Sequence, residues 1–396
     1  MVDIATIGTF LVAALAALFM AWSIGAGSSG STPFAPAVGA NAISVMRAGF
    51  FVGLLGFAGA VLQGANVSEA VGNELIKGVT LTPIAAVVSL SVAATLVAIG
   101  VFAGYPIATA FTSTGAVIGV GLAMAGDPAW AKYTEIATLW VLTPFVGGGI
   151  AYTIARMLRD EPIREERLII GLAALVGAVI ANIEFAILGP AGEGRSLAQA
   201  IGGWVPLGPT PSVLVVTLVI AVLWGVVVGF DLDKGTERGE RHFLLVLGGL
   251  VAFSAGGSQV GLAIGPLVPV SGDLEIPLIA LLLGGGVGLL IGSWTGAPRM
   301  IKAISQDYSS LGPRRSIAAL IPSFAIAQVA VLFGIPVSFN EIIVSSIIGS
   351  GYAASTAGGG VSARKMGYTV LAWVLSLAGS ILVSFTGYWI ISSLFL

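Results

Sequence analysis

The stretch GYPIATAFTSTGAVIGVGLA at residues 104–123 returns, about 230 residues later, as GIPVSFNEIIVSSIIGSGYA at residues 334–353. The same offset aligns SIGAGSSGSTPFAPAVG (23–39) with SAGGSQVGLAIGPLVPV (254–270), and WVLTPFVGG (140–148) loosely with WVLSLAGS (373–380). Three segments recur in the same order, so the chain contains an internal duplication. Duplicated apolar halves that Gly and Pro interrupt at matching positions are typical of secondary transporters with a site between the repeats. The positions shared by the first pair are Gly104 and Gly334, Pro106 and Pro336, Ile118 and Ile348, Gly119 and Gly349, and Gly121 and Gly351.

The composition excludes a water-soluble globular protein. Hydrophobic residues make up 57% of the 396 residues, charged residues only 9%, and the mean hydropathy is +1.02. A surface built from such a chain would be too apolar for water. An apolar helix of about 20 residues spans a bilayer. We predict an all-α polytopic membrane protein with roughly ten spans, at 4–24, 43–63, 81–101, 136–156, 168–188, 212–230, 243–254, 276–296, 316–334 and 369–394.

Four apolar stretches are interrupted by Gly, Ser and Pro, at 25–40, 104–125, 255–270 and 334–355. Irregular backbone at membrane depth persists only where protein or water satisfies its polar groups. Glycine-rich helix packing explains part of this pattern, but not the matching prolines and serines. We therefore predict two inverted-topology repeats whose broken or re-entrant half-helices meet at a central site. The predicted units are a first repeat at 1–160, connecting spans and loops at 161–242, and a second repeat at 243–396.

Charged residues concentrate in two loops, RMLRDEPIREER (156–167) and DLDKGTERGERH (231–242). Two apolar segments separate them, so both are predicted on one side, and their Lys and Arg favour the cytoplasmic side of the plasma membrane. The chain has no Cys and one His, His242, which excludes thiol chemistry and argues against a zinc or His-based enzyme. We expect no metal and no cofactor. A net charge of −2 gives no basic field for nucleic acid.

The interrupted segments supply neutral hydroxyls and amides, which are expected where half-helices begin. A helix N-terminus offers unpaired N–H groups and a partial positive charge, so it binds anions without Lys or Arg. Glycines let backbone amides approach the ligand closely. The predicted ligand is a compact oxyanion, with a halide as the weaker alternative. The candidate binding residues are Ser28, Ser29, Ser31, Thr109, Ser258, Gln259, Ser338 and Asn340, with Gly25, Gly27, Gly256 and Gly257 as backbone positions at helix N-termini.

These motifs resemble those of the inorganic phosphate transporter (PiT) family. FSAGGSQVGLAIGPLVPV (253–270) is similar to its Gly-Ala-Asn-Asp signature, and PIATAF (106–111) and PVSFNE (336–341) are similar to its Pro-Val-Ser-Thr-Thr-His signature. WVLTP (140–144) resembles its Trp-and-Pro helix. The resemblance covers both halves. It implies an inverted-repeat fold that imports an inorganic oxyanion together with Na⁺ or H⁺, and by analogy a homodimer.

The chain departs from that signature at the acidic positions. Gly27 and Ser28 in one copy, and Ser258 and Gln259 in the other, stand where the family has Asn-Asp. Without carboxylates the usual Na⁺ sites are in doubt, because hard cations prefer such oxygens. A site of donors alone would favour sulfate, which carries no proton, over phosphate. GAGSS (25–29) also resembles a sulfate-permease branch of the family. Sulfate is narrowly favoured, phosphate is the alternative, and other dianions stay open.

Coupling to H⁺ requires a group that changes its charge, and Glu341 replaces the signature His inside an apolar stretch. An intramembrane carboxylate is a functional candidate. The competing interpretation is a capping Glu that bonds amides at the start of the half-helix. Glu184, near the end of another span, is expected at an interface or in a structural contact. A passive anion channel is the second alternative for the whole chain, and a membrane enzyme has little support.

Overall fold

The computed structural model describes residues 4–160, 164–189, 194–308, 310–353 and 362–395, and most of them are helical. The first part of the chain contains α1 (Ile4–Gly27), α2 (Ala35–Gly39), α3 (Val45–Gln63), α4 (Ala65–Asn73), α5 (Pro83–Ala103), α6 (Thr109–Ala123) and α7 (Trp130–Arg159). The middle part contains α8 (Glu165–Ala181), α9 (Leu197–Gly202) and α10 (Pro209–Asp233). Two short antiparallel ribbons pair β1 (Ile76–Lys77) with β2 (Asp127–Pro128), and β3 (Glu184–Phe185) with β4 (Arg195–Ser196).

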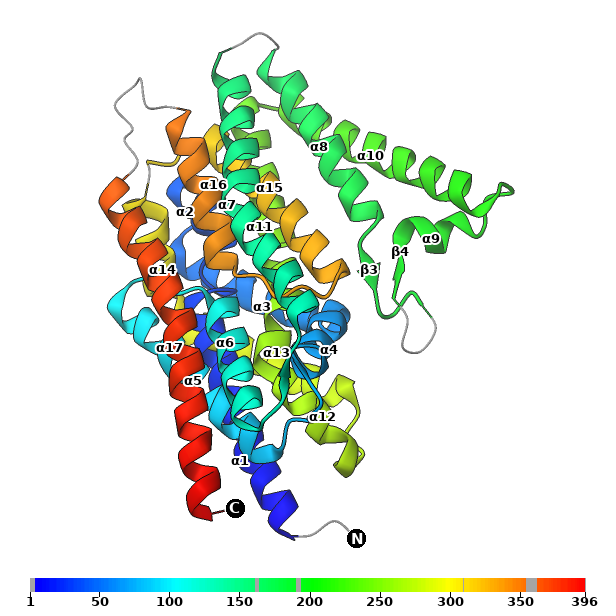
Figure 1. Ribbon diagram of the computed structural model, residues 1–396. Helices are drawn as coiled ribbons and strands as arrows, with labels where there is room; N and C mark the ends of the chain where they lie inside the picture. Colours follow the sequence, from blue (N-terminus) through cyan, green and yellow to red (C-terminus); the bar gives the residue numbers. More distant parts are fainter. Residues whose placement is uncertain (1–3, 161–163, 190–193, 309, 354–361, 396) are drawn as a thin grey trace.

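The last part of the chain repeats the order of the first. It contains α11 (Thr236–Ile264), η1 (Gly265–Leu267), α12 (Val268–Ser271), η2 (Gly272–Leu274), α13 (Leu278–Thr295), α14 (Ala297–Asp307), α15 (Pro313–Leu332), α16 (Phe339–Tyr352) and α17 (Ala363–Phe395). By the sequence offset, α1, α3, α5, α6 and α7 correspond to α11, α13, α15, α16 and α17. Corresponding helices run in opposite directions: α7 ends at the top of Figure 1, whereas α17 ends at the bottom beside the C-terminus.

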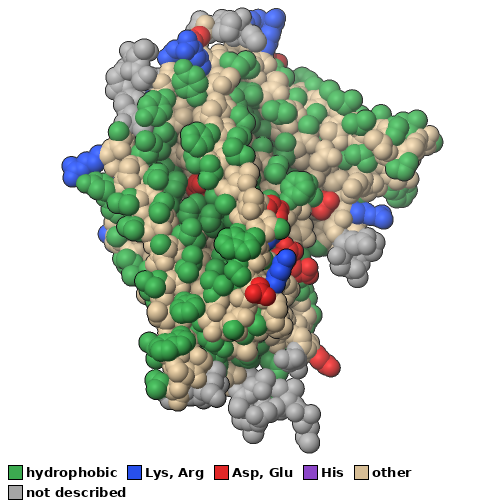
Figure 2. Space-filling view, in the orientation of Figure 1, with side chains coloured by type: hydrophobic (Ala, Val, Ile, Leu, Met, Phe, Trp, Pro, Cys, Tyr) green, Lys and Arg blue, Asp and Glu red, His purple; other side chains and the backbone are tan. Residues whose placement is uncertain are grey.

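Within the described residues, nine helices are long and apolar enough to cross a membrane. They match nine of the ten predicted spans. The exception is 168–188, because α8 ends at Ala181 and the chain continues through Asn182 into β3. The α8–α10 arm projects from the bundle (Figure 1), and hydrophobic side chains cover most of the visible surface (Figure 2).

The two halves make matching contacts with each other. Trp140 on α7 donates its indole N–H to the carbonyl oxygen of Pro336, at 2.8 Å, just before α16. Trp373 on α17 donates in the same way to the carbonyl oxygen of Pro106, at 2.8 Å, just before α6. Each half therefore anchors the segment that leads into the other half's short helix.

Glycines allow two matching pairs of helices to cross with their backbones in contact. A Cβ on Gly256 of α11 would lie 1.8 Å from the carbonyl oxygen of Gly56 on α3. The corresponding Cβ on Gly25 of α1 would lie 2.2 Å from the carbonyl oxygen of Leu289 on α13. Likewise, a Cβ on Gly349 of α16 would meet the carbonyl oxygen of Gly148 at 2.0 Å. No side chain fits at these crossings, so packing explains these glycines.

The two charged loops lie at one end of the bundle, as predicted. The Thr236 hydroxyl donates to a carboxylate oxygen of Glu166, at 3.2 Å, which joins the start of α11 to the start of α8. Arg314, at the start of α15, pairs with Glu165 at the same end. Residues 161–163 of the first loop lie outside the described residues.

Candidate functional site

Two of the four predicted interruptions are the entrances to short helices. Residues 105–108 and 335–338 are extended, and α6 and α16 begin directly after them. Gly104 (φ +75°) and Gly334 (φ +61°) turn the chain out of the preceding helices in the left-handed region, where glycine carries no steric cost. Thr109 and Asn340 therefore lie in the first turns of half-helices, as expected, and Ser338 caps α16 by accepting a long hydrogen bond from the Glu341 amide.

The other pair of interruptions differs from the prediction. The helix α1 ends at Gly27, so Gly25 and Gly27 lie at a helix C-terminus. In the second copy α11 continues unbroken to Ile264, so Gly256 and Gly257 lie inside a helix. The assignment of these four glycines to helix N-termini is wrong. They serve close packing instead, and the carbonyl oxygen of Gly27 accepts a hydrogen bond from Asn340.

Gln259 lies at the centre of a buried polar cluster that joins both repeats. Its Nε2 donates to the carbonyl oxygen of Val337 at 2.6 Å, and this bond fixes the orientation of the amide. Its Oε1 then accepts from the hydroxyls of Thr109 (2.7 Å) and Ser28 (3.2 Å). The Thr109 and Ser28 hydroxyl oxygens lie 3.4 Å apart. The cluster thus contacts the end of α1, the start of α6, the middle of α11 and the segment before α16.

Asn340 fixes its amide in a similar way but leaves its oxygen free. Its Nδ2 donates to the carbonyl oxygens of Ile107 (2.6 Å) and Gly27 (3.0 Å), so both amide hydrogens are used. Carbonyls only accept, hence Oδ1 must be the other end of the group. This oxygen is buried and has no hydrogen-bond partner among the described residues. A buried acceptor without a donor is costly, and it indicates a place where a ligand can donate.

The remaining candidates contribute unequally. The Ser258 hydroxyl is buried without a partner in the described part of the chain. The Ser31 hydroxyl bonds to the Ser28 carbonyl oxygen at 3.2 Å inside the turn that follows α1, where Ser29 is also buried. The cluster therefore brings together Ser28, Thr109, Gln259 and Asn340, whereas Ser31 stabilises its own turn.

This arrangement contains donors and acceptors but no carboxylate among the clustered side chains. The hydroxyls of Ser28 and Thr109 can donate to an anion, as can the first-turn amides of α6 and α16, which have no partner inside their helices. The oxygens of Asn340 and Gln259 accept. The expectation of a site made of donors alone therefore does not hold.

A family model described as the phosphate transporter family matches residues 24–384. The chain belongs to this family. A putative phosphate permease of Thermococcus kodakarensis is 27% identical over 87% of this chain and 88% of its own length. The chloroplastic inorganic phosphate transporter 2-1 of Arabidopsis thaliana is 24% identical over 91% of this chain and 68% of its own. A solved structure titled as the sodium-dependent phosphate transporter superposes with a TM-score of 0.82 at 21% identity, covering 98% of this chain and all of that one.

The resemblance to the PiT family is thus confirmed, and the chain is a membrane protein of a transporter family. Within this phosphate transporter family member, the cluster around Gln259 occupies the positions of the signature motifs. The family assignment fixes the class of protein, while the role of each side chain in the cluster stays a prediction.

Glu341 lies in the first turn of α16 and is 2% exposed. Its backbone amide bonds to the Ser338 hydroxyl at 3.5 Å, but its carboxylate oxygen Oε2 has no partner among the described residues. The interpretation of Glu341 as a capping residue is therefore supported only in part: its amide takes part in a helix cap, but its Oε2 does not. The side chain lines a groove of about 680 Å³ between α7, α16 and α17.

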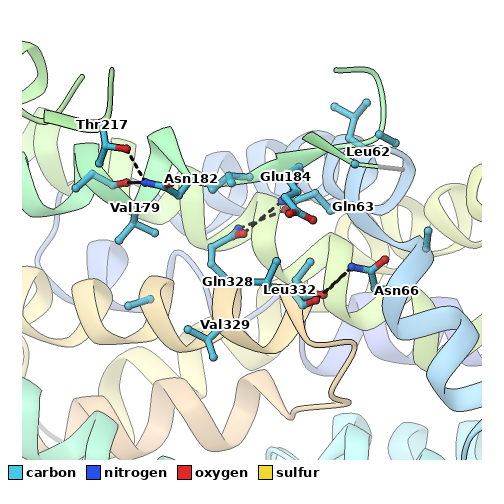
Figure 3. Close-up of a pocket in the computed structure, with 17 residues that line it drawn as sticks. Leu62, Gln63, Asn66, Val179, Asn182, Glu184, Thr217, Gln328, Val329 and Leu332 are labelled. Atoms are coloured by element: carbon cyan, nitrogen blue, oxygen red, sulfur yellow. Dashed lines mark hydrogen bonds between the residues drawn. The ribbon is translucent and has the colours of Figure 1, made fainter. Parts of the chain in front are cut away.

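Sequence reasoning missed a second polar cluster in this transporter. The amides of Gln63 on α3 and Gln328 on α15 bond to each other at 3.3 Å in both directions. Gln63 also donates to the backbone oxygen of Glu184, and Gln328 donates to the Ser254 hydroxyl. They line a cavity of about 450 Å³ under the α8–α10 arm (Figure 3). A single Gln inside each apolar span was the available signal. Glu184 lies in a structural contact, as expected.

Proposed function

We propose that this chain carries inorganic phosphate across the membrane and binds it in the cluster around Gln259. The observation that carries the proposal is the free Oδ1 of Asn340, a buried acceptor in the first turn of α16 whose amide nitrogen bonds to the Ile107 carbonyl just before α6. Hydrogen phosphate has both a negative charge for donors and an O–H group for such an acceptor. Sulfate has no proton to donate at neutral pH. The acceptor therefore favours phosphate over the sulfate predicted from the missing aspartates.

Binding would require the cluster to reorganise only slightly. Without a ligand, the hydroxyls of Ser28 and Thr109 both point at Gln259 Oε1. Rotation of these two hydroxyls toward an anion keeps their oxygens in place, and the amide of Gln259 remains anchored at Val337. The partial positive charge at the starts of α6 and α16 adds to the attraction.

We further propose that transport is coupled to H⁺ through Glu341, with Na⁺ as the alternative. The described residues contain no group of three or more His, Cys, Asp or Glu side chains that could hold a metal ion, and hard cations prefer carboxylate ligands. Glu341 is a buried carboxyl group on the half-helix that also carries Asn340. The opposite directions of corresponding helices support two inverted repeats, 1–160 and 243–396, that meet at the cluster. The plasma membrane and a homodimer remain part of this proposal.

The test is uptake of radiolabelled phosphate into proteoliposomes that contain the purified chain, with imposed pH or Na⁺ gradients. We expect saturable uptake, counterflow, and weak competition by sulfate. Asn340→Ala should lower uptake at least about tenfold, since one buried hydrogen bond to an ion contributes about 1.5–3 kcal/mol.

The matched control is Asn66→Ala. Asn66 also donates its amide to two backbone carbonyls, those of Val331 and Leu332, but it lies outside the cluster. Its variant should keep wild-type uptake. Preferential uptake of sulfate would reject phosphate as the transported anion. Flux without counterflow would indicate a channel. Stimulation by a Na⁺ gradient alone would reject coupling to H⁺ through Glu341.

A further inference from the structure

A groove of about 680 Å³ runs between α7 and α17, with α16 at its floor. Its outer rim is apolar and accessible: Phe145 is 74% exposed, Val141 63% and Val374 56%. These three residues belong to helices that are long and apolar enough to span a membrane. The groove therefore opens sideways into the hydrocarbon region of the bilayer, and a molecule that enters it must partition into lipid.

The residues that line the groove include two pairs related by the duplication, and the two members of one pair differ in residue type. Trp140 and Trp373 occupy corresponding positions in the two repeats, and both line it. Phe111 and Glu341 also correspond, and both line it. Phe111 stacks on Trp140 with ring centroids 3.9 Å apart. No aromatic ring in the described parts of the chain stacks on Trp373, because a carboxyl group replaces the phenyl ring in this half.

Glu341 is the single charged side chain among the residues that line this groove. It is almost fully buried, and its Oε2 has no hydrogen-bond partner among the described residues. An ionised carboxylate in such surroundings is strongly destabilised unless a cation pairs with it. The lining offers no Lys or Arg for that purpose. The carboxyl group of Glu341 is therefore neutral and protonated until a cation from outside the chain pairs with it.

We propose that this groove is a binding site for lipophilic amines. The ammonium group pairs with the carboxylate of Glu341 in the groove that Trp373 also lines, where a cation is attracted both by the opposite charge and by the aromatic ring. The hydrocarbon tail lies along Val141, Phe145 and Val374 and reaches the lipid. Lipophilic anions are excluded, because the carboxylate repels them. This inference depends on the groove and does not depend on which anion the chain transports.

The experiment measures thermal unfolding of the full chain in detergent micelles with matched twelve-carbon ligands: dodecylamine, dodecanol and dodecanoate. Dodecylamine should raise the Tm of the wild type by about 2 °C or more beyond dodecanol, because only the folded groove binds it. Dodecanoate should give no rise. Equal shifts with dodecylamine and dodecanol would overturn the proposal, and this comparison needs no variant.

Two variants locate the site. Glu341→Gln and Trp373→Leu should each abolish or reduce the shift that is specific to dodecylamine. The control is Glu184→Gln, which removes a carboxylate from the cavity under the α8–α10 arm and should leave the shift unchanged. An undiminished shift in Glu341→Gln, or a lost shift in Glu184→Gln, would place amine binding elsewhere. Because unfolding is measured without transport, a failure here is distinguishable from a failure of phosphate uptake.

Discussion

Ser28 and Thr109 donate to the same oxygen of Gln259 because that amide is held from its other end by the Val337 carbonyl. The sequence predicted these residues, since each falls at a matched position of the duplication. It could not predict the directions of the amides, which depend on carbonyls more than 70 residues away. The sequence alone therefore could not reveal the unpaired Oδ1 of Asn340, on which the choice of phosphate as the substrate depends. Gln63 and Gln328 were missed because the repeat gives them no matching partner.

Ser28→Asp is expected to weaken the uptake of sulfate more strongly than that of phosphate. The new carboxylate would lie beside Gln259 Oε1 and the Thr109 hydroxyl, so it would repel an anion in surroundings of low dielectric constant by several kcal/mol. The initial rate of sulfate uptake should fall at least about tenfold, and that of phosphate should fall less, because hydrogen phosphate can donate its O–H group to the new carboxylate. Ser28→Asn, which has a similar shape without the charge, is the control and should lose less. Equal losses in the two variants would mean that charge at this position is unimportant.

At the scale of elements, the two Gly-rich segments of similar sequence adopt different structures. After Gly27 the hydroxyls of Ser31 and Thr32 bond to the nearby Ser28 carbonyl, and Pro33 follows. Such side chains compete with the helix, and proline disfavours it in the preceding residue. In the second copy QVGLAI (259–264) has apolar helix formers, and the helix ends just before Pro266. In this pair of segments the interruption follows the hydroxyls and prolines and is independent of the glycines inside the helices, which is why the predicted break at 255–270 was placed too early.

Gly256→Ala is expected to destabilise the fold. The new methyl group would lie 1.8 Å from the Gly56 carbonyl oxygen, so α3 and α11 would have to separate. Overpacking of this kind costs about 1–3 kcal/mol. Gly284→Ala on α13 is the control, because a Cβ there has no atom within 4 Å and alanine favours the helix. Thermal unfolding in detergent should show a lower Tm for the first variant only. Equal Tm values would show that this crossing is loosely packed.

For the whole molecule, the membrane-spanning class and nine of the predicted spans followed from composition and apolar stretches, whereas the family followed from the resemblance of the motifs. The orientation in the bilayer rests on Lys and Arg in the two charged loops alone. Both loops lie at the end of the bundle opposite the C-terminus (Figure 1). This separation gives the orientation a direct test, because the chain contains no Cys that would have to be removed.

Single cysteines at Lys234 and Ser393, both exposed positions, should react with a membrane-impermeant maleimide from opposite sides. In intact cells we expect Ser393→Cys to be labelled and Lys234→Cys to be labelled only after the membrane is permeabilised. The wild type, which lacks cysteine, is the control for background. The reverse pattern would place the charged loops outside the cell, and labelling of both in intact cells would exclude that the two positions lie on opposite sides.

The glycine crossings also restrict how this molecule can move. Where α1 crosses α13 and α3 crosses α11, the backbones are in direct contact, and no side chain lies between them. The same is true where α16 meets α7. Helices joined in this way cannot slide past each other without losing contact along their whole length. Any opening toward either side of the membrane must therefore occur at helix interfaces formed by side chains. The helices joined at each glycine crossing move together as a rigid body.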